Sequence, residues 1–444
     1  MRRTVKVLLI AYHFPPANTV GVQRTLRFSR SLTEQGCQVH VLTVEPEYYP
    51  ARAEESWQAI PARVTVHRTR AWQPLLTAHR VVRSVVRPSL WQRLRRLRAW
   101  GRFLFTAPDP QVGWWPFACL VGLGLICRTG MDVLYTTSPP HSAHLIGWTL
   151  QRLTGRPWVA DFRDAWTTNP LWRARDSSPL RQRWERKLEH AVLRAANRVI
   201  TNTETLKETF LCLYPNLPPD KLVPLMNGFD RADFAVPLPP QDEDRFTLVY
   251  AGTINLSPDP AYPPVYRLDP FLGALGELTV ARPELQRRLR VVLLGPLAQG
   301  GEAELAALVE NCGVAALVEY RGQTSHAEAV RHLLRADALL LVHYDGPGGE
   351  AWVPAKTFEY LATGKPILAL LPPRGDLYRL LRDQPQVFLA SNQPTAIRPA
   401  LERLLQQADR LPLCCDRRLG YWERKRQGEQ FYRILVEVCS RESA

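Results

Sequence analysis

Cysteine pairs of the CxxC type are missing from this 444-residue chain, although it has eight cysteines. Without such pairs, and without a histidine cluster near any cysteine, we expect reduced thiols in a cytoplasmic protein, with no zinc site and no disulfide framework. Lysine is also scarce, with 7 of 57 basic residues. The net charge of +15 therefore comes from arginine, and it favours anionic partners such as nucleotides, phospholipid headgroups or nucleic acid.

Long hydrophobic runs are lacking too. The uncharged, mostly apolar run at residues 112–126 contains Pro116 and is shorter than the roughly twenty residues that a spanning helix needs. The apolar run at residues 7–11 is too short for a signal peptide, so it is expected to be a buried strand. We therefore expect no transmembrane segment. With 45% hydrophobic and 22% charged residues, the composition is that of a globular protein and excludes disorder for most of the chain.

Short apolar runs alternate with amphipathic stretches along the whole chain, a pattern typical of α/β domains with parallel sheets. The pattern restarts after residue 245, beyond a segment rich in proline and charge. The sequence thus predicts two doubly wound α/β domains of similar size. The expected divisions are a first domain at 1–235, a linker at 236–245, a second domain at 246–415 and a C-terminal helical segment at 416–444.

One segment interrupts the alternation. Residues 79–102 carry eight arginines and no acid, interleaved with valine, leucine and two tryptophans. They form either a solvated helix face or an interfacial helix on an anionic membrane surface, at the inner face of the plasma membrane. Nucleic acid is not an expected partner, because no DNA- or RNA-binding module accompanies the charge.

Glycine-rich phosphate motifs are absent, since the chain has neither a GxGxxG fingerprint nor a GK[ST] loop. The first strand is followed by a proline-rich loop in which Gly21 opens a helix. Backbone N–H groups at such a position can approach a phosphate, and the helix dipole favours the anion. The alternative is a plain turn between a strand and a helix.

The second half contains VPAKTFEYLATGKPILAL, in which a helix from Lys356 is expected to end at Gly364 before a strand. Glu359 then lies near the carboxyl edge of the sheet, where α/β folds bind ligands. It can accept hydrogen bonds from two ribose hydroxyls, and Lys356, one turn earlier, can face a diphosphate. The alternative is a solvated Lys–Glu pair at i and i+3.

Several motifs, taken in order, resemble a family-4 glycosyltransferase of the GT-B fold, of the kind that builds bacterial surface polysaccharides. These are PPANTVGVQRTLRF, YTTSPPHSAHLIG, PWVADFRDAW, MNGFDRADF, LVYAGTI, VVLLGP, VEYRGQTS and KTFEYLATGKPILA. The resemblance covers nearly the whole chain. It implies two Rossmann-like doubly wound domains facing a central cleft, with a C-terminal helix at 416–444 that crosses back to the first domain. It implies transfer with retention of anomeric configuration, no metal and no cofactor beyond the nucleotide-sugar donor.

The resemblance also implies roles for individual residues. Glu359 would bind the ribose, while Arg321 and Lys356 would neutralise the leaving diphosphate. The nucleotide-sugar site as a whole is expected to comprise Gly21, Val22, Gly252, Thr253, Arg267, Gly295, Arg321, Glu350, Lys356, Thr357, Phe358 and Glu359.

Some positions depart from the family pattern. A second acid usually lies eight residues before the ribose-binding one, where this chain has Ala351 and, one residue earlier, Glu350. Many members carry a histidine near the acceptor, where this chain has Ser138, with His141 three residues on. Arg267 is the nearest basic residue to a usual Arg/Lys pair.

The DFRDAW motif follows a predicted strand, so its side chains are expected at the carboxyl edge of the first sheet. Asp161 or Asp164 can orient an acceptor hydroxyl, and Arg163 can pair with a phosphate. The alternative is an internal Arg–Asp ion pair that holds the loop. With Ser138 and His141, these are the candidate catalytic residues.

The sequence thus predicts a retaining glycosyltransferase that moves a sugar from a UDP- or GDP-sugar to a lipid-linked or polysaccharide acceptor in cell-envelope synthesis. Two alternatives keep the fold: a nucleotide-sugar 2-epimerase and a catalytically degenerate scaffold that binds nucleotide-sugars. An NAD-dependent enzyme is disfavoured by the missing glycine fingerprint.

Overall fold

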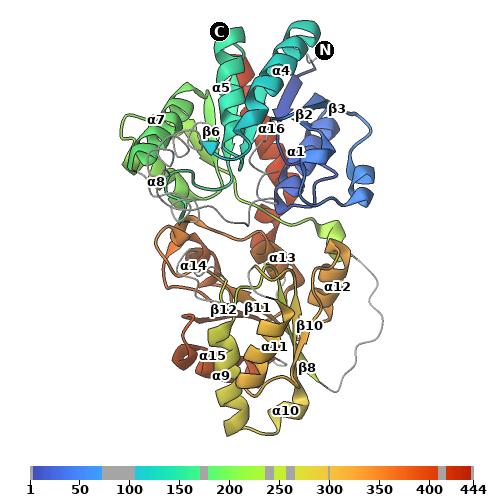
Figure 1. The fold of residues 1–444 in the computed structure, drawn as a ribbon, viewed down its shortest axis with the longest axis vertical. Coiled ribbons are helices and arrows are strands. Elements are labelled where there is room, and N and C mark those ends of the chain that lie inside the picture. The colour runs from blue at the N-terminus through green and yellow to red at the C-terminus, as the bar shows by residue number, and fades with distance from the viewer. Residues whose placement is uncertain are drawn as a thin grey trace, which may run out of the picture. The chain divides into compact units, whose positions relative to one another are not determined.

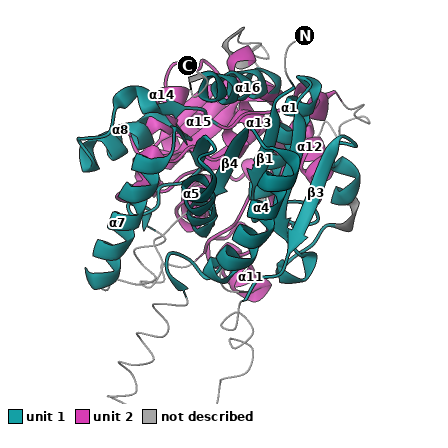
Figure 2. Ribbon diagram, turned by 90° about the horizontal axis from the view of Figure 1, so that it is seen from above, with its two compact units in different colours: residues 1–226, 425–444 teal, residues 227–424 magenta. Residues whose placement is uncertain are grey.

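The computed structural model describes residues 4–72, 106–170, 179–235, 245–256, 266–298, 301–408 and 417–441 (Figure 1). The chain divides into two compact units (Figure 2). Unit 1 comprises Met1–Met226 and Lys425–Ala444, and unit 2 comprises Asn227–Arg424.

The division of the chain falls at other residues than the sequence predicts. Residues 227–235 belong to unit 2 rather than to the first domain. Phe229 forms a β-bridge with Glu423, and the Asp233 carboxylate lies 3.2 Å from Nε2 of His326. The basic segment 79–102 and positions 236–244 of the expected linker lie outside the described residues.

Unit 1 is built on a seven-stranded sheet in the order β3-β2-β1-β4-β5-β6-β7, with every pairing parallel. Its strands are β1 Lys6–Ile10, β2 Gln38–Val44, β3 Val64–Thr69, β4 Val133–Ser138, β5 Trp158–Phe162, β6 Arg198–Thr201 and β7 Leu222–Pro224. Its helices are α1 Val20–Glu34, α4 Trp115–Thr129, α5 Ser142–Thr154, α7 Pro179–Ala195, α8 Glu204–Leu213 and α16 Arg424–Arg441. Short 3-10 turns are η1 Pro46–Tyr48, η2 Glu54–Ala59, η3 Val112–Trp114 and η4 Pro219–Lys221.

The two faces of this sheet are covered by different helices. Val7 and Leu9 of β1 belong to a core with α1 and α16, whereas Leu42 of β2 lies on the other face, where α4 approaches it. Because both faces are buried, β1 has a continuous apolar run rather than an alternating one, and every residue of β4 is buried. The C-terminal helix α16 contributes the fully buried Phe431 to the core between this sheet and α1.

Unit 2 repeats the arrangement with a six-stranded parallel sheet in the order β10-β9-β8-β11-β12-β13. Its strands are β8 Phe246–Ala251, β9 Leu289–Leu294, β10 Val318–Tyr320, β11 Ala338–Val342, β12 Ile367–Leu370 and β13 Val387–Ala390. Its helices are α9 Asp269–Ala281, α10 Leu285–Arg288, α11 Glu302–Asn311, α12 His326–Arg335, α13 Lys356–Thr363, α14 Gly375–Leu381 and α15 Pro394–Gln407. Its 3-10 turns are η5 Arg231–Phe234, η6 Gly349–Ala351 and η8 Arg417–Trp422.

Local sequence signals explain where several of these helices begin and end. Ser325 and Glu328 form a capping box at the start of α12. Gly364 takes the left-handed conformation, with φ of 69°, and ends α13 as predicted. The C-terminal helix begins at Arg424, after the 3-10 turn η8, so the single long helix expected from the sequence is wrong in its first turns.

One helical stretch in the described part of the chain, Val112–Thr129, is long and apolar enough to cross a membrane by length and composition alone. It consists of η3 and α4. We predicted no such segment from the sequence, because the prediction considered only the uncharged run at residues 112–126. The helix continues through Arg128 to Thr129. This stretch packs within unit 1, where Trp114 is fully buried and its Nε1 donates to Thr69 Oγ1 at 2.7 Å.

Candidate active site

Both sheets have a topological switch point, where neighbouring strands are followed by connections to opposite sides. It lies between β1 and β4 in unit 1 and between β8 and β11 in unit 2. Ligands of open α/β sheets bind at the carboxyl ends of the strands at such points. The predicted site residues follow these strands or β5, β9 and β10, or lie at the start of α1 and α13.

Two glycines and a lysine meet at the switch point of unit 2. Gly252 follows β8 with φ of 143°, and Gly295 follows β9 with φ of 127°. A Cβ atom on Gly295 would lie 2.1 Å from the carbonyl oxygen of Gly252, and one on Gly252 would lie 2.7 Å from Nζ of Lys356. Only glycine fits at either position. The Gly252 loop thus comes close to the Lys356 ammonium at the start of α13, and the Gly295 loop packs against the Gly252 loop.

The Lys356 ammonium forms cation–π contacts with two aromatic rings. Its Nζ lies 4.0 Å from the ring centroid of Tyr250 and 5.3 Å from that of Tyr266. Burial lowers the pKa of Lys356 to about 7, and the charge of Glu359 offsets only part of this shift. Within the described residues no carboxylate forms an ion pair with it. We call Gly252, Gly295 and Lys356, with the rings of Tyr250 and Tyr266, the lysine cradle.

The rest of α13 divides between core and surface. Thr357 and Phe358 are fully buried, so their side chains support the helix rather than face a ligand. Glu359 is 18% exposed and lies 3.8 Å from Nη2 of Arg424. Tyr360 accepts a hydrogen bond from the backbone N–H of Ala251 at 2.8 Å, which fixes α13 against the end of β8.

Other predicted residues of unit 2 have partners of their own. Arg267 forms an ion pair with Asp269, and Arg321 forms one with Glu319. The Glu350 carboxylate accepts hydrogen bonds from the Gly348 N–H and from Nε of Arg374, at 2.9 and 3.0 Å. The arginines are therefore already neutralised, and Glu350 is held within its own turn. The exposed Thr253 uses its carbonyl oxygen to accept from the Tyr250 hydroxyl at 2.6 Å.

In unit 1, Arg163 lies against the first turn of α1. Its Nε donates to the carbonyl oxygen of Ser138 at 3.0 Å, and its Nη2 to that of Pro139 at 2.6 Å. A Cβ atom on Gly21 would lie 2.5 Å from Nη1, so the glycine makes room for the guanidinium. Val22 is buried and its N–H donates to Thr19, which leaves it a structural role.

Neutral imidazoles surround this guanidinium. Burial, and secondarily the charge of Arg163, lower the pKa of His13 and of His144 to about 3. The pKa of His141 is also lowered, by burial first and then by His144 and Arg163. Fully buried, His141 stacks on Trp166 with centroids 5.0 Å apart. The Ser138 hydroxyl oxygen is buried too and has no hydrogen-bond partner among the described residues.

The Asp161 carboxylate is part of a buried hydrogen-bond network. Its carboxylate accepts from Nε and Nη2 of Arg24, each at 2.9 Å, and from the Tyr135 hydroxyl at 2.6 Å. Thr137 donates as well, at 2.9 Å. The ion pair considered from the sequence therefore exists, but its arginine is Arg24 of α1 rather than Arg163. Asp164 is beside Arg163, and burial raises its pKa while the Arg163 charge opposes the rise.

Sequence reasoning missed the aromatic part of the lysine cradle and the role of Arg24. Tyr250 stands two residues before Gly252 in the predicted strand, a signal that could have been used. Tyr266, which has a positive φ of 57°, comes from a loop without a recognisable motif. Arg24 is separated from Asp161 by 137 residues, and no local pattern reveals such a pair.

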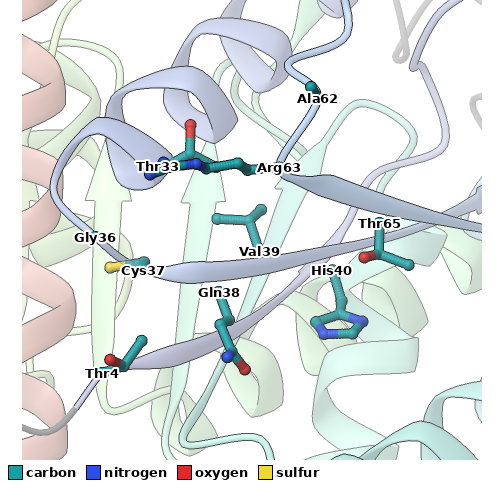
Figure 3. A pocket seen from close by; sticks show the side chains of 10 residues that line it. All are labelled: Thr4, Thr33, Gly36, Cys37, Gln38, Val39, His40, Ala62, Arg63 and Thr65. Carbon is teal, nitrogen blue, oxygen red and sulfur yellow. The ribbon is translucent and has the colours of Figure 1, made fainter.

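A hollow of about 500 Å³ lies elsewhere, at the amino ends of β1, β2 and β3 (Figure 3). It is lined by Thr4, Cys37, His40 and Arg63, among others. This edge is opposite to the one where α/β sheets bind ligands, so we do not include the hollow in the site. Among the described residues, no group of three or more His, Cys, Asp or Glu could hold a metal ion.

Comparison with known proteins agrees with this architecture. Residues 21–228 match the family model of the glycosyl transferase 4-like domain. A glycosyltransferase from Rickettsia africae ESF-5 aligns with a TM-score of 0.63 at 11% identity over 98% of both chains. Anabaena Alr3699/HepE, solved in complex with UDP, aligns at 0.58 and 12%, over 99% of this chain and 98% of that one. WaaG, a glycosyltransferase involved in lipopolysaccharide biosynthesis, aligns at 0.52 and 15% over 98% of both. No curated protein matches the chain.

At these identities the structural likeness shows the fold, and the fold is GT-B: two parallel-sheet α/β domains in one chain. Residues 21–228 form a glycosyl transferase 4-like domain.

Proposed function

We propose that this protein transfers a sugar from a UDP- or GDP-sugar to a lipid-linked or polysaccharide acceptor, with retention of anomeric configuration. The observation that carries the donor assignment is the lysine cradle, in which a partly buried cation, without an ion-pair partner among the described residues, lies against the Gly252 loop. A diphosphate supplies the missing negative charge. The complex of Anabaena HepE with UDP is consistent with a uridine nucleotide.

The proposed chemistry depends on charge stabilisation. As the sugar leaves, the nucleoside diphosphate gains negative charge, which a fixed cation stabilises more strongly in the transition state than in the ground state. We assign this role to Lys356, and ribose binding to Glu359, one turn further along α13. Arg321 serves the diphosphate only if its ion pair with Glu319 opens.

In unit 1 we assign phosphate binding to Arg163 and the amide of Gly21, because the guanidinium lies beside the first turn of a 15-residue helix. Asp164 is our candidate to orient the acceptor hydroxyl. Asp161 acts through Arg24 as a positioning residue. The buried His141 and Ser138 support the loop, and a direct role for either in transfer requires the loop to open.

We place the reaction at the cytoplasmic face of the membrane, in cell-envelope polysaccharide synthesis, with no resident metal or cofactor. The involvement of WaaG in lipopolysaccharide biosynthesis supports this setting by analogy. We expect activity to be unchanged by EDTA, because the Lys356 cation supplies the charge stabilisation that a metal would otherwise give. Loss of activity that Mg²⁺ restores would contradict this assignment.

A catalytically degenerate scaffold is the second candidate. It is favoured by the ion pairs that neutralise Arg267 and hold Glu350. Such a protein would bind the nucleotide-sugar without hydrolysing or transferring it, whereas an epimerase would convert the donor without any acceptor.

The first experiment is thermal stabilisation of the protein by UDP, GDP, ADP, CMP and NAD, since a ligand of the native state raises the melting temperature. We expect a shift with UDP or GDP that is lost in Lys356→Met. Glycan products are then sought with the donor, with and without acceptors. No shift with any nucleotide would contradict the donor assignment, and a shift without turnover would favour the scaffold.

A further inference from the structure

Helix α4 carries several of its large apolar side chains outward. Ala118, Gly122 and Ile126 are buried, whereas Phe117, Leu120 and Val121 are exposed, Leu120 to 74%. Positions 117, 120, 121 and 124 follow one another along one face of a helix. A helix that stabilises a soluble core has the opposite arrangement. We call Phe117, Leu120, Val121 and Gly124 the α4 face.

The side of α4 opposite the α4 face packs tightly on α5. A Cβ atom on Gly122 would lie 2.7 Å from Cδ1 of Leu150 in α5, so the small residue allows close approach. Trp115 Nε1 donates to Thr149 Oγ1 of α5 at 2.9 Å. The two helices lie side by side (Figure 1). The position of α4 is thus fixed by its inner side, and its outer side has no partner within the described residues.

The charged residues of α4 and α5 have one sign. Neither α4 nor α5 contains an acidic residue, and their last turns carry Arg128 and Arg152. Leu153, at the end of α5, is 63% exposed. An apolar helix face with arginines beside it matches the boundary between the acyl chains and the headgroups of an anionic bilayer. A protein partner would usually be recognised by polar groups as well, and the α4 face offers none.

We propose that the α4 face inserts into the headgroup layer of an anionic membrane, with α4 lying on the surface rather than crossing it. Crossing would require the inner side of α4 to leave α5 and the sheet. The proposal deepens the proposed function, on which its link to a lipid-linked acceptor rests, because it brings unit 1 to the membrane where such an acceptor is anchored.

The test is co-sedimentation of the full chain with vesicles of phosphatidylcholine alone or mixed with phosphatidylglycerol. We expect binding to the anionic vesicles that falls at least tenfold in Leu120→Glu, since a charge replaces an inserted apolar side chain. The matched control is Val280→Glu, which places the same charge at an 81% exposed valine of α9 in unit 2 and is expected to bind like the wild type. Arg128→Gln with Arg152→Gln is expected to reduce the preference for anionic vesicles.

Equal binding by Leu120→Glu and the wild type would overturn the proposal, and so would no vesicle binding by the wild type. A wild-type dimer that Leu120→Glu converts to a monomer, without vesicle binding, would assign the face to a second copy and overturn it as well. Nucleotide-induced thermal shifts, measured on the same variants, report on folding and on the donor site. A nucleotide shift without vesicle binding defeats this inference alone, whereas vesicle binding without a nucleotide shift defeats the donor assignment alone.

Discussion

At the scale of single residues, the lowered pKa of Lys356 gives a direct test of the donor site. With a pKa of about 7, most of the free protein has a neutral Lys356 at pH 8. A bound diphosphate raises this pKa, so binding takes up close to one proton. UDP itself is fully ionised at pH 8, because its last phosphate proton has a pKa of about 6. We expect UDP affinity to fall by up to about tenfold per pH unit above pH 7.

Calorimetry at pH 8 in Tris and in HEPES measures this uptake, because each buffer releases the proton with its own enthalpy. Lys356→Arg is the control: its guanidinium stays charged in both states, so its binding enthalpy should not depend on the buffer. Buffer-independent enthalpies for the wild type would show that Lys356 does not titrate on binding.

Glu359 tests the ribose assignment separately. Each hydrogen bond from a sugar hydroxyl to a carboxylate contributes about 1.5–3 kcal/mol, so Glu359→Ala should weaken UDP or GDP binding at least tenfold. Glu304→Ala, at an exposed acid of α11, is the matched control and should leave affinity unchanged. If both variants bind nucleotide as the wild type does, Glu359 has no part in the site.

Sequence reasoning predicted the place of Lys356 and Glu359 at the edge of the sheet, because a strand, a glycine and a helix start lie within a short stretch; their binding roles stay predictions. It did not find Tyr266 or Arg24, since their positions depend on chain segments that meet only in the folded protein. The same limit explains Asp161: the motif suggested an arginine partner, but the network of Arg24, Tyr135 and Thr137 depends on register across neighbouring strands and a helix.

At the scale of the element, substitutions at two glycines of α4 are expected to change the stability of the protein in different ways. Gly122→Leu should destabilise the protein by about 1–3 kcal/mol, because the added side chain collides with Leu150 and forces the helices apart. A Cβ atom on Gly124 would meet nothing within 4 Å, so Gly124→Ala should be neutral or stabilising by up to about 1 kcal/mol. Urea unfolding measures both, and a cost at Gly124 equal to that at Gly122 would contradict the packing of α4 on α5.

Strand β1 was predicted from the apolar run at residues 7–11, because burial on both faces leaves a continuous apolar sequence. The edge strands β3 and β7 were not predicted. β3 contains His67 and Arg68 and is only partly buried, and β7 has three residues, so neither carries a strong apolar signal. Helix α4 was hard to recognise for the opposite reason: it is apolar on both sides, and periodicity cannot separate a buried face from an exposed one.

At the scale of the whole molecule, unit 2 is one continuous segment, whereas unit 1 is completed by α16 from the far end of the chain. Phe431 of α16 stacks on Phe28 at 4.3 Å between ring centroids and meets Tyr135 edge-on at 4.8 Å. Phe431→Ala should therefore destabilise unit 1 by about 3–5 kcal/mol. Hydrogen exchange followed by mass spectrometry is expected to show faster exchange in β1, β4 and α1, while β8 to β12 of unit 2 keep their protection.

Arg433→Ala, at an exposed position one half-turn further along α16, is the matched control and should change exchange in neither unit. Equal loss of protection in both units after Phe431→Ala would mean that the chain unfolds as one cooperative body. In that case the two units, although each has its own hydrophobic core, would not be separate units of unfolding. Loss confined to unit 1 would mean that the last helix, synthesised after unit 2, is required to complete a domain whose strands precede it by roughly two hundred residues or more.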